Sequence, residues 1–228
     1  MKKLPIAFIL ALLWQSLSAI AQPGILRVGF DVDDTVLYSR RLFESLPENK
    51  RAPVDYGWIN SHDKDYSIPI EPTATLIHFF RAHGHEVYFI TSRDDGNGSQ
   101  LAEYLSDVLG FDVVKDRNLF FSPRERSGEN RYTTKHRVMK DLHLDLFYGD
   151  SDNDMIAALK AGVHPVRIVR HSSSIEQYGS NYFGNTLDGS SPGAPFSSDD
   201  LKIFYRAHVG IFGETIYPII WDGPPSNR

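Results

Sequence analysis

Short apolar runs alternate with amphipathic segments through the middle of this chain. The runs at 25–30, 87–90, 118–121, 144–148 and 166–169 have the length and continuity of buried strands. Between them, apolar residues recur at helical spacing, and we expect helices at 101–109, 134–142 and 155–161 and between Pro72 and Gly84. Strands that alternate with helices predict an α/β fold whose central, mostly parallel sheet is covered on both faces.

Three other regions follow a different pattern. Residues 39–70 are polar with scattered aromatic residues, and we expect irregular structure there. Gly, Ser, Asn and Pro dominate 172–198, which is typical of a loop. The apolar stretch IFGETIYPIIW (211–221) predicts an edge strand or a subunit contact.

The N-terminus has the features of a secretory signal peptide. Lys2 and Lys3 precede an apolar run (4–13), and the segment ends in Ala19-Ile20-Ala21. A membrane anchor is the alternative, but the run is shorter than the roughly 20 residues that span a bilayer. We therefore expect removal near Ala21 and a periplasmic or secreted chain (22–228) with no membrane segment.

The composition narrows the chemistry. The 228 residues include 24 Lys and Arg, 29 Asp and Glu and no Cys, for a net charge of −5. Without a basic surplus, nucleic-acid binding is not expected. Without Cys, thiol nucleophiles and thiolate metal sites are excluded.

Charged and hydroxyl side chains follow the expected strands. In an open parallel sheet, the carboxyl ends of the strands meet at one edge, where ligands bind. The residues predicted to converge there, with one lysine from a helix start, are Asp31, Asp33, Thr91, Ser92, Lys135, Asp150 and Asp154.

These side chains match the needs of phosphoryl transfer. Several carboxylates share a small site in ionised form only beside a cation, and an all-oxygen cluster suits Mg²⁺ first. Lys135, Thr91 and Ser92 offer donors to an anion. A metal, an anion site and a carboxylate nucleophile predict transfer through an aspartyl-phosphate.

Motifs in this order resemble those of the haloacid dehalogenase superfamily: FDVDDTV (30–36), Thr91, Lys135 and GDSDND (149–154). More narrowly, VGFDVDDTVLYS, the SIP at 67–69, the TTK that ends at Lys135 and the FGE at 212–214 resemble the bacterial class B acid phosphatases. The resemblance covers 27–170 and a short C-terminal piece. It implies a three-layer, Rossmann-like fold with a small cap after the first strand (38–70), and here a loop-rich insert (171–211).

The resemblance also implies roles for single residues. Asp31 matches the nucleophile and Mg²⁺ ligand, and Asp33 the general acid/base, whose carbonyl is a second ligand. Asp150 matches the third ligand, and Asp154 a carboxylate that orients metal-bound waters or Lys135. Thr91, Ser92 and Lys135 match the groups that bind phosphate, although Ser92 stands where the family usually has Gly.

The function implied is a secreted acid phosphatase with one Mg²⁺ per subunit, acting on small-molecule phosphate monoesters such as nucleotides or aryl phosphates. Phosphotransfer to alcohols and a homotetramer are further features that the resemblance suggests. The alternatives are a phosphatase of the same superfamily specific for a nucleotide or sugar phosphate, and a catalytically silent binding or storage protein.

Two points stay open on the sequence alone, and one expectation concerns a pKa. Phe43, Tyr56 and Trp58 could form an aromatic wall for the leaving group or simply pack locally. Arg93 could bind phosphate or pair with a carboxylate. Neighbouring carboxylates are expected to raise the pKa of Asp33, as its acid role needs.

Overall fold

The computed structural model describes residues 24–123, 125–127, 130–132, 134–168, 171, 173–174, 215–217, 221 and 223. The predicted signal peptide (1–21) lies outside this part of the chain. So does the predicted loop-rich insert (171–211), apart from residues 171, 173 and 174. Across the described residues, no helix has the length and apolarity needed to cross a bilayer.

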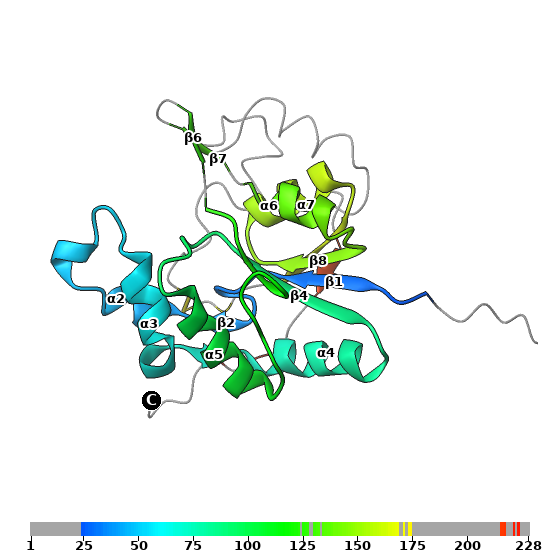
Figure 1. Ribbon diagram of the computed structural model, residues 1–228, viewed down its shortest axis with the longest axis horizontal. Helices are drawn as coiled ribbons and strands as arrows, with labels where there is room; N and C mark the ends of the chain where they lie inside the picture. Colours follow the sequence, from blue (N-terminus) through cyan, green and yellow to red (C-terminus); the bar gives the residue numbers. More distant parts are fainter. Residues whose placement is uncertain are drawn as a thin grey trace, which may run out of the picture.

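Six strands of the described chain form a central sheet in the order β10-β9-β8-β1-β4-β5 (Figure 1). Every neighbouring pair in it is parallel, which confirms the predicted α/β fold with a mostly parallel sheet. Its strands are β1 (Arg27–Phe30), β4 (Glu86–Thr91), β5 (Leu119–Phe121), β8 (Leu146–Gly149), β9 (His164–Ile168) and β10 (Thr215–Tyr217). The expected edge strand near the C-terminus is therefore confirmed as β10.

Helices cover both faces of this sheet (Figure 1). On one face, Ile77 and Phe80 of α4 (Glu71–Ala82) and Leu105 of α5 (Gly98–Leu109) pack against strand residues such as Phe30 and Phe89. On the other, α6 (Lys135–Asp141) and α7 (Asp152–Ala161) pack against β4 and β8. The buried residues of that second cluster are Ile90, Met139, Leu144, Phe147, Ala157, Ala158 and Val163.

Alternation along the strands explains these two cores. Phe89 and Ile90 are neighbours on β4 and point to opposite faces, as do Phe147 and Tyr148 on β8. All four side chains are buried, and burying each aromatic or aliphatic side chain of this size contributes about 1.5–3 kcal/mol. The strand ends that carry the polar motifs therefore rest on a rigid support.

A helical insertion follows the first strand. The short strands β2 (Leu37–Tyr38) and β3 (Ile68–Pro69) pair antiparallel at its base. Between them lie α2 (Arg40–Glu44), η1 (Glu48–Lys50) and α3 (Tyr56–Tyr66). Figure 1 shows α2 and α3 beyond the carboxyl ends of the central strands, which is where the predicted cap region (38–70) would cover a site.

The prediction of irregular structure for 39–70 is wrong, and α3 shows why. Asp55 caps this helix by accepting a hydrogen bond from the Trp58 amide at 2.9 Å. Its buried residues are Ile59, Asn60 and Asp63, so polar side chains occupy much of the inward face. A helix with such a face lacks the apolar periodicity on which the prediction depends.

One further element was not expected. Strands β6 (Glu125–Ser127) and β7 (Asn130–Tyr132) form an antiparallel hairpin just before α6.

Near the other end of the chain, Trp221 packs edge-on against Tyr38, with ring centroids 5.5 Å apart. Trp221 thereby contacts the base of the insertion.

Candidate active site

Asp31 stands where β1 ends. Its amide donates to the Tyr148 carbonyl at 2.8 Å, which extends the pairing of β1 with β8 by one residue. Its carboxylate accepts from the Val32 amide at 2.7 Å. The residue is 8% exposed, so its carboxylate is largely buried at the carboxyl ends of the strands but still reaches solvent.

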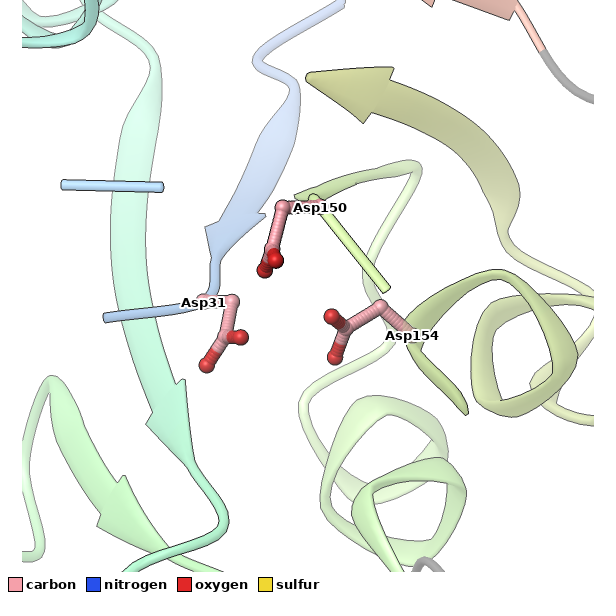
Figure 2. Close-up of side chains that lie close together, drawn as sticks. All are labelled: Asp31, Asp150 and Asp154. Atoms are coloured by element: carbon pink, nitrogen blue, oxygen red, sulfur yellow. The ribbon is translucent and has the colours of Figure 1, made fainter. Parts of the chain in front are cut away.

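Three carboxylates meet at this point (Figure 2). Asp31 follows β1, Asp150 follows β8 and Asp154 lies in the first turn of α7. One oxygen from each lies within 4.8 Å of the others, which is the spacing of a possible metal site. Thr35 supports the group by donating its hydroxyl to Asp150 Oδ1 at 3.3 Å.

The start of α7 holds Asp154 in place. Its Oδ2 accepts from the Ser151 hydroxyl at 2.6 Å and from the Ser151 amide at 3.2 Å. Its own amide donates to the Ser151 hydroxyl oxygen at 3.3 Å, which completes the reciprocal pattern of a capping box. A Cβ atom at residue 149 would collide with the Asp154 side chain, so only Gly149 leaves room for it. Local packing as well as charge thus explains three residues of the GDSDND sequence, namely Gly149, Ser151 and Asp154.

Lys135 joins two of these carboxylates. Its Nζ lies 2.7 Å from Asp31 Oδ1 and 2.6 Å from Asp154 Oδ1, and the residue is 2% exposed. The preceding residue, Thr134, shares a 2.7 Å hydrogen bond with the Ser122 hydroxyl and donates to the Pro123 carbonyl at 3.0 Å. These contacts attach the start of α6 to the end of β5 and so position Lys135.

The electrostatics of this acid cluster favour a bound cation. Burial, followed by the charge of Asp154, raises the pKa of Asp31 well above its ordinary value, although Lys135 opposes this shift. Burial alone would lower the pKa of Lys135, but Asp154 and Asp31 raise it, so the ammonium stays charged. Lys135 contacts two of the three carboxylates, and an all-oxygen set of this kind fits a hard divalent ion such as Mg²⁺.

Asp33 faces a different cation. Arg93 binds it in a bidentate manner, with Nη2 at 2.7 Å from Oδ1 and Nε at 2.9 Å from Oδ2. The same guanidinium contacts Asp63 of α3, with Nη1 at 2.5 Å from Oδ2 and Nη2 at 3.1 Å from Oδ1. Arg93 therefore pairs with carboxylates, which settles a question that the sequence left open.

The expectation of a raised pKa for Asp33 is wrong. Burial does act in that direction, but the charge and hydrogen bonds of Arg93 outweigh it and lower the pKa of Asp33. The prediction considered the neighbouring carboxylates only, because nothing in the local sequence shows that Arg93 folds back onto Asp33. Sixty residues separate the two in the chain.

Thr91 and Ser92 lie at the neighbouring strand end. The register pairs Phe30 with Phe89, so Thr91 at the end of β4 lies beside the loop that Asp31 begins. Its hydroxyl accepts from the Arg93 amide at 3.2 Å, and Ser92 is half-buried at the turn. The structure thus brings Asp31, Lys135, Asp150 and Asp154 into contact and leaves the phosphate-binding roles of Thr91 and Ser92 as predictions.

Sequence reasoning missed Asp63 and Asn60. Asn60 accepts from Arg93 Nη1 at 3.1 Å, and both residues are about 1% exposed. The available signal was a pair of polar residues three apart within 39–70, which helical spacing would place on one face. It carried no information on the partner, because Arg93 lies 30 residues further along the chain.

The aromatic residues of the insertion pack locally. Phe43, Tyr56 and Trp58 surround a small core of Leu42, Leu46 and Ile59. Trp58 also stacks on His62, with ring centroids 4.0 Å apart. Phe43 also lies near the site described above, since the Arg93 guanidinium carbon is 5.9 Å from its ring centroid.

The sequence of this chain is similar to those of known class B acid phosphatases. The chain is 32% identical over 156 residues to the class B acid phosphatase of a Rahnella strain, covering 64% of each chain. It is 30% identical over 164 residues to that of Haemophilus parainfluenzae, covering 67% of this chain and 66% of the relative. These alignments span about two thirds of the relatives' length.

One solved structure aligns with most of this chain. The crystal structure of a predicted phosphatase from Clostridium acetobutylicum aligns with 78% of this chain and 97% of its own, at 16% identity and a TM-score of 0.42. The family model of the acid phosphatases, subfamily IIIB of the HAD superfamily, matches residues 14–176, which include the whole of the site described above. This chain belongs to that acid phosphatase family.

Proposed function

We propose that this protein hydrolyses phosphate monoesters through an aspartyl-phosphate formed on Asp31. The observation that carries the proposal is the environment of this carboxylate, which is buried, 2.7 Å from the Lys135 ammonium and grouped with Asp150 and Asp154. A carboxylate nucleophile needs a phosphoryl group held in line and a charge environment that tolerates an anion. Lys135 supplies a cation, and Thr91 and Ser92 lie at the adjacent strand end.

The reaction has two balanced steps. An Asp31 oxygen attacks phosphorus, the ester P–O bond breaks, and the leaving alkoxide takes a proton from the Asp33 carboxyl group. Water then attacks the aspartyl-phosphate, Asp33 takes a proton from that water, and inorganic phosphate leaves with Asp31 restored. An incoming phosphate monoester brings negative charge close to Asp33, which favours the protonated carboxyl group needed at the start.

The acid cluster fits Mg²⁺ in this proposal. Asp31, Asp150 and the Asp33 carbonyl would hold the ion, and Asp154 would keep Lys135 oriented. When bound, Mg²⁺ neutralises charge on the phosphoryl oxygens. Mildly acidic conditions suit the scheme because they favour a protonated Asp33, and transfer to an alcohol in place of water would be the phosphotransferase activity.

The substrate class follows from the insertion. Phe43 lies near the Arg93–Asp33 pair, which supports esters with an aryl or nucleoside leaving group. A phosphatase of narrow specificity is the second candidate, because the sequence of 40–65 departs from the resemblance where the insertion would contact substrate. The presence of Asp31 and Asp150 argues against a catalytically silent protein. Export and a homotetramer belong to the proposal on the strength of the N-terminal segment and the family resemblance.

The test is release of p-nitrophenol from p-nitrophenyl phosphate by residues 22–228 at mildly acidic pH. We expect activity with Mg²⁺ that is lost with EDTA and in Asp31→Asn. Asp112→Asn removes the same charge at an exposed position and should keep full activity. Activity that survives EDTA or Asp31→Asn would place the reaction elsewhere. An inactive chain with intact Mg²⁺ binding would favour the narrow-specificity enzyme or a binding protein.

A further inference from the structure

We propose that Asp63 and Asn60 of α3 are positioning residues that act through Arg93 to hold the Asp33 carboxyl group for proton transfer to the leaving group. This inference rests on the proposed function, in which Asp33 supplies that proton. It gives the insertion a part in the chemical step in addition to any contact with substrate.

The guanidinium of Arg93 uses its full hydrogen-bonding capacity. An arginine side chain has five N–H donors in a fixed planar fork. In Arg93, Nε and Nη2 donate to Asp33, Nη1 and Nη2 donate to Asp63, and Nη1 donates to Asn60. Each of these five contacts has its own N–H donor, so all three partners together determine the orientation of the guanidinium.

The partners on α3 are themselves fixed. Asp63 Oδ1 accepts from the Ser67 hydroxyl at 2.8 Å, just after the helix ends. The Asn60 amide donates to the carbonyls of Asp94 at 3.0 Å and Gly96 at 2.8 Å, in the loop that follows Arg93. These contacts attach α3 to the end of β4, so Arg93 cannot rotate without breaking several hydrogen bonds.

Exposure separates the two carboxylates on this guanidinium. The Asp63 side chain is 0% exposed, whereas that of Asp33 is 28% exposed and open to a substrate at the strand ends. Asp63 therefore cannot reach substrate and acts only through Arg93. A buried network of ion pairs is weak evidence for stability, because apolar residues of similar size often serve a fold as well. Its geometric effect on Asp33 is the better explanation for its presence.

The nature of the leaving group distinguishes positioning from a merely structural role. An alkoxide must receive a proton as the ester bond breaks, whereas dinitrophenolate leaves without one. If α3 positions Asp33, loss of Asp63 or Asn60 slows alkyl esters most and activated aryl esters least. If α3 only supports the fold, all esters slow alike.

The experiment measures kcat/KM of the Mg²⁺-loaded protein on glycerol 2-phosphate, phenyl phosphate and 2,4-dinitrophenyl phosphate. Asp63→Asn and Asn60→Ala should lose about 10–100-fold on glycerol 2-phosphate and little on the dinitrophenyl ester, the same direction as Asp33→Asn. The matched control is Asp55→Asn, which removes one carboxylate from the same helix at its cap, where Asn serves equally well. Its dependence on the leaving group should equal that of the unmodified chain.

An equal loss on the three esters, or no loss, would overturn the positioning role while the proposed function stands. If the unmodified chain hydrolyses none of the esters, the proposed function fails and the positioning role fails with it. Should Asp63→Asn not fold, Asn60→Ser decides the question, since it leaves both carboxylates on Arg93 and removes only the side-chain amide.

Discussion

Asp31 and Asp33 lie two residues apart on one loop, yet their surroundings differ in every respect that matters for chemistry. Asp31 shares the Lys135 ammonium with Asp154 and lies beside Asp150, and its pKa is raised. Asp33 forms a bidentate pair with Arg93, and its pKa is lowered. The position of a carboxylate in a motif therefore does not decide its ionisation.

The partners of the two carboxylates come from different parts of the molecule. The Asp31 side is built from β1, β8, α6 and α7, which are elements of the layered core. The Asp33 side runs from the end of β4 to α3, which belongs to the insertion. On the first side, one oxygen from each of three carboxylates lies within 4.8 Å of the others, an arrangement that fits a divalent cation, whereas on the second side Arg93 pairs with both carboxylates. We expect the first to respond to metal and the second to the insertion.

Removing the ammonium from the Asp31 side should have the largest effect. Lys135→Met keeps the volume of the side chain but leaves Asp31 and Asp154 buried without their cation. Breaking a buried pair in this way costs about 3–5 kcal/mol in the free energy of unfolding. We expect that loss in urea unfolding of the metal-free protein. We also expect a fall of about 10²–10³ in kcat, since Lys135 donates to the phosphoryl group in the proposed function.

Lys115→Met is the matched control for this change. Lys115 pairs with Asp95 at 2.7 Å, but the two side chains are 29% and 66% exposed, so water replaces the lost partner. Its unfolding midpoint should equal that of the unmodified chain. Equal midpoints for Lys135→Met and Lys115→Met would show that the Asp31 side does not depend on its ammonium.

Adding a cation to the Asp31 side should have the next largest effect. A ligand present at 100 times its Kd stabilises the folded state by about 2.7 kcal/mol, so Mg²⁺ should raise the Tm of the unmodified chain. Asp150→Asn should remove that shift, because it takes one carboxylate from the cluster.

Thermal melts with and without MgCl₂ check this loss of the Mg²⁺ shift. Asp112→Asn, at an exposed position, should keep the full Mg²⁺ shift. A Tm that rises with Mg²⁺ in Asp150→Asn as much as in the unmodified chain would mean that the ion binds at another place.

The same division between core and insertion explains what the sequence could predict. The strands, α4 and α5 follow from apolar periodicity, and the residues at the strand ends converge because parallel strands share one carboxyl edge. Motif spacing and strand topology were therefore enough to predict which side chains lie close together, namely those of Asp31, Lys135, Asp150 and Asp154. Their contacts depend on elements whose order the pattern already predicts.

The Asp33 side depends on information that local patterns do not contain. The inward face of α3 carries Asn60 and Asp63, so its amphipathic pattern is weak and the sequence predicts irregular structure there. The partner that makes this polar face favourable is Arg93, which arrives from a different strand end. A polar residue that is buried only because of a distant partner is not recognisable until the fold brings the two together.

The smallest effect that we expect concerns a hydrogen bond between α5 and the residue that follows the C-terminal end of α3. Tyr104 of α5 donates its hydroxyl to the Ser67 carbonyl, immediately after α3, at 2.5 Å. Tyr104→Phe should lower the free energy of unfolding by about 1 kcal/mol, the usual contribution of one hydrogen bond. It should leave the leaving-group dependence of kcat/KM unchanged, because the Arg93 contacts remain.

The pH dependence of that small effect follows from the phenol. Burial, and next the charge of Asp63, raise the pKa of Tyr104 to about 12 from an ordinary value of 10.0. The fold therefore favours the neutral phenol, and the contribution of Tyr104 is complete below the ordinary pKa and is lost as the pH rises towards about 12. Urea unfolding of both chains from neutral to alkaline pH should show the difference between them constant at first and shrinking above that ordinary value. A difference that grows with alkalinity would mean that the ionised phenol is the form the fold prefers, and α3 would then be held at this end by a contact other than the Tyr104 hydroxyl.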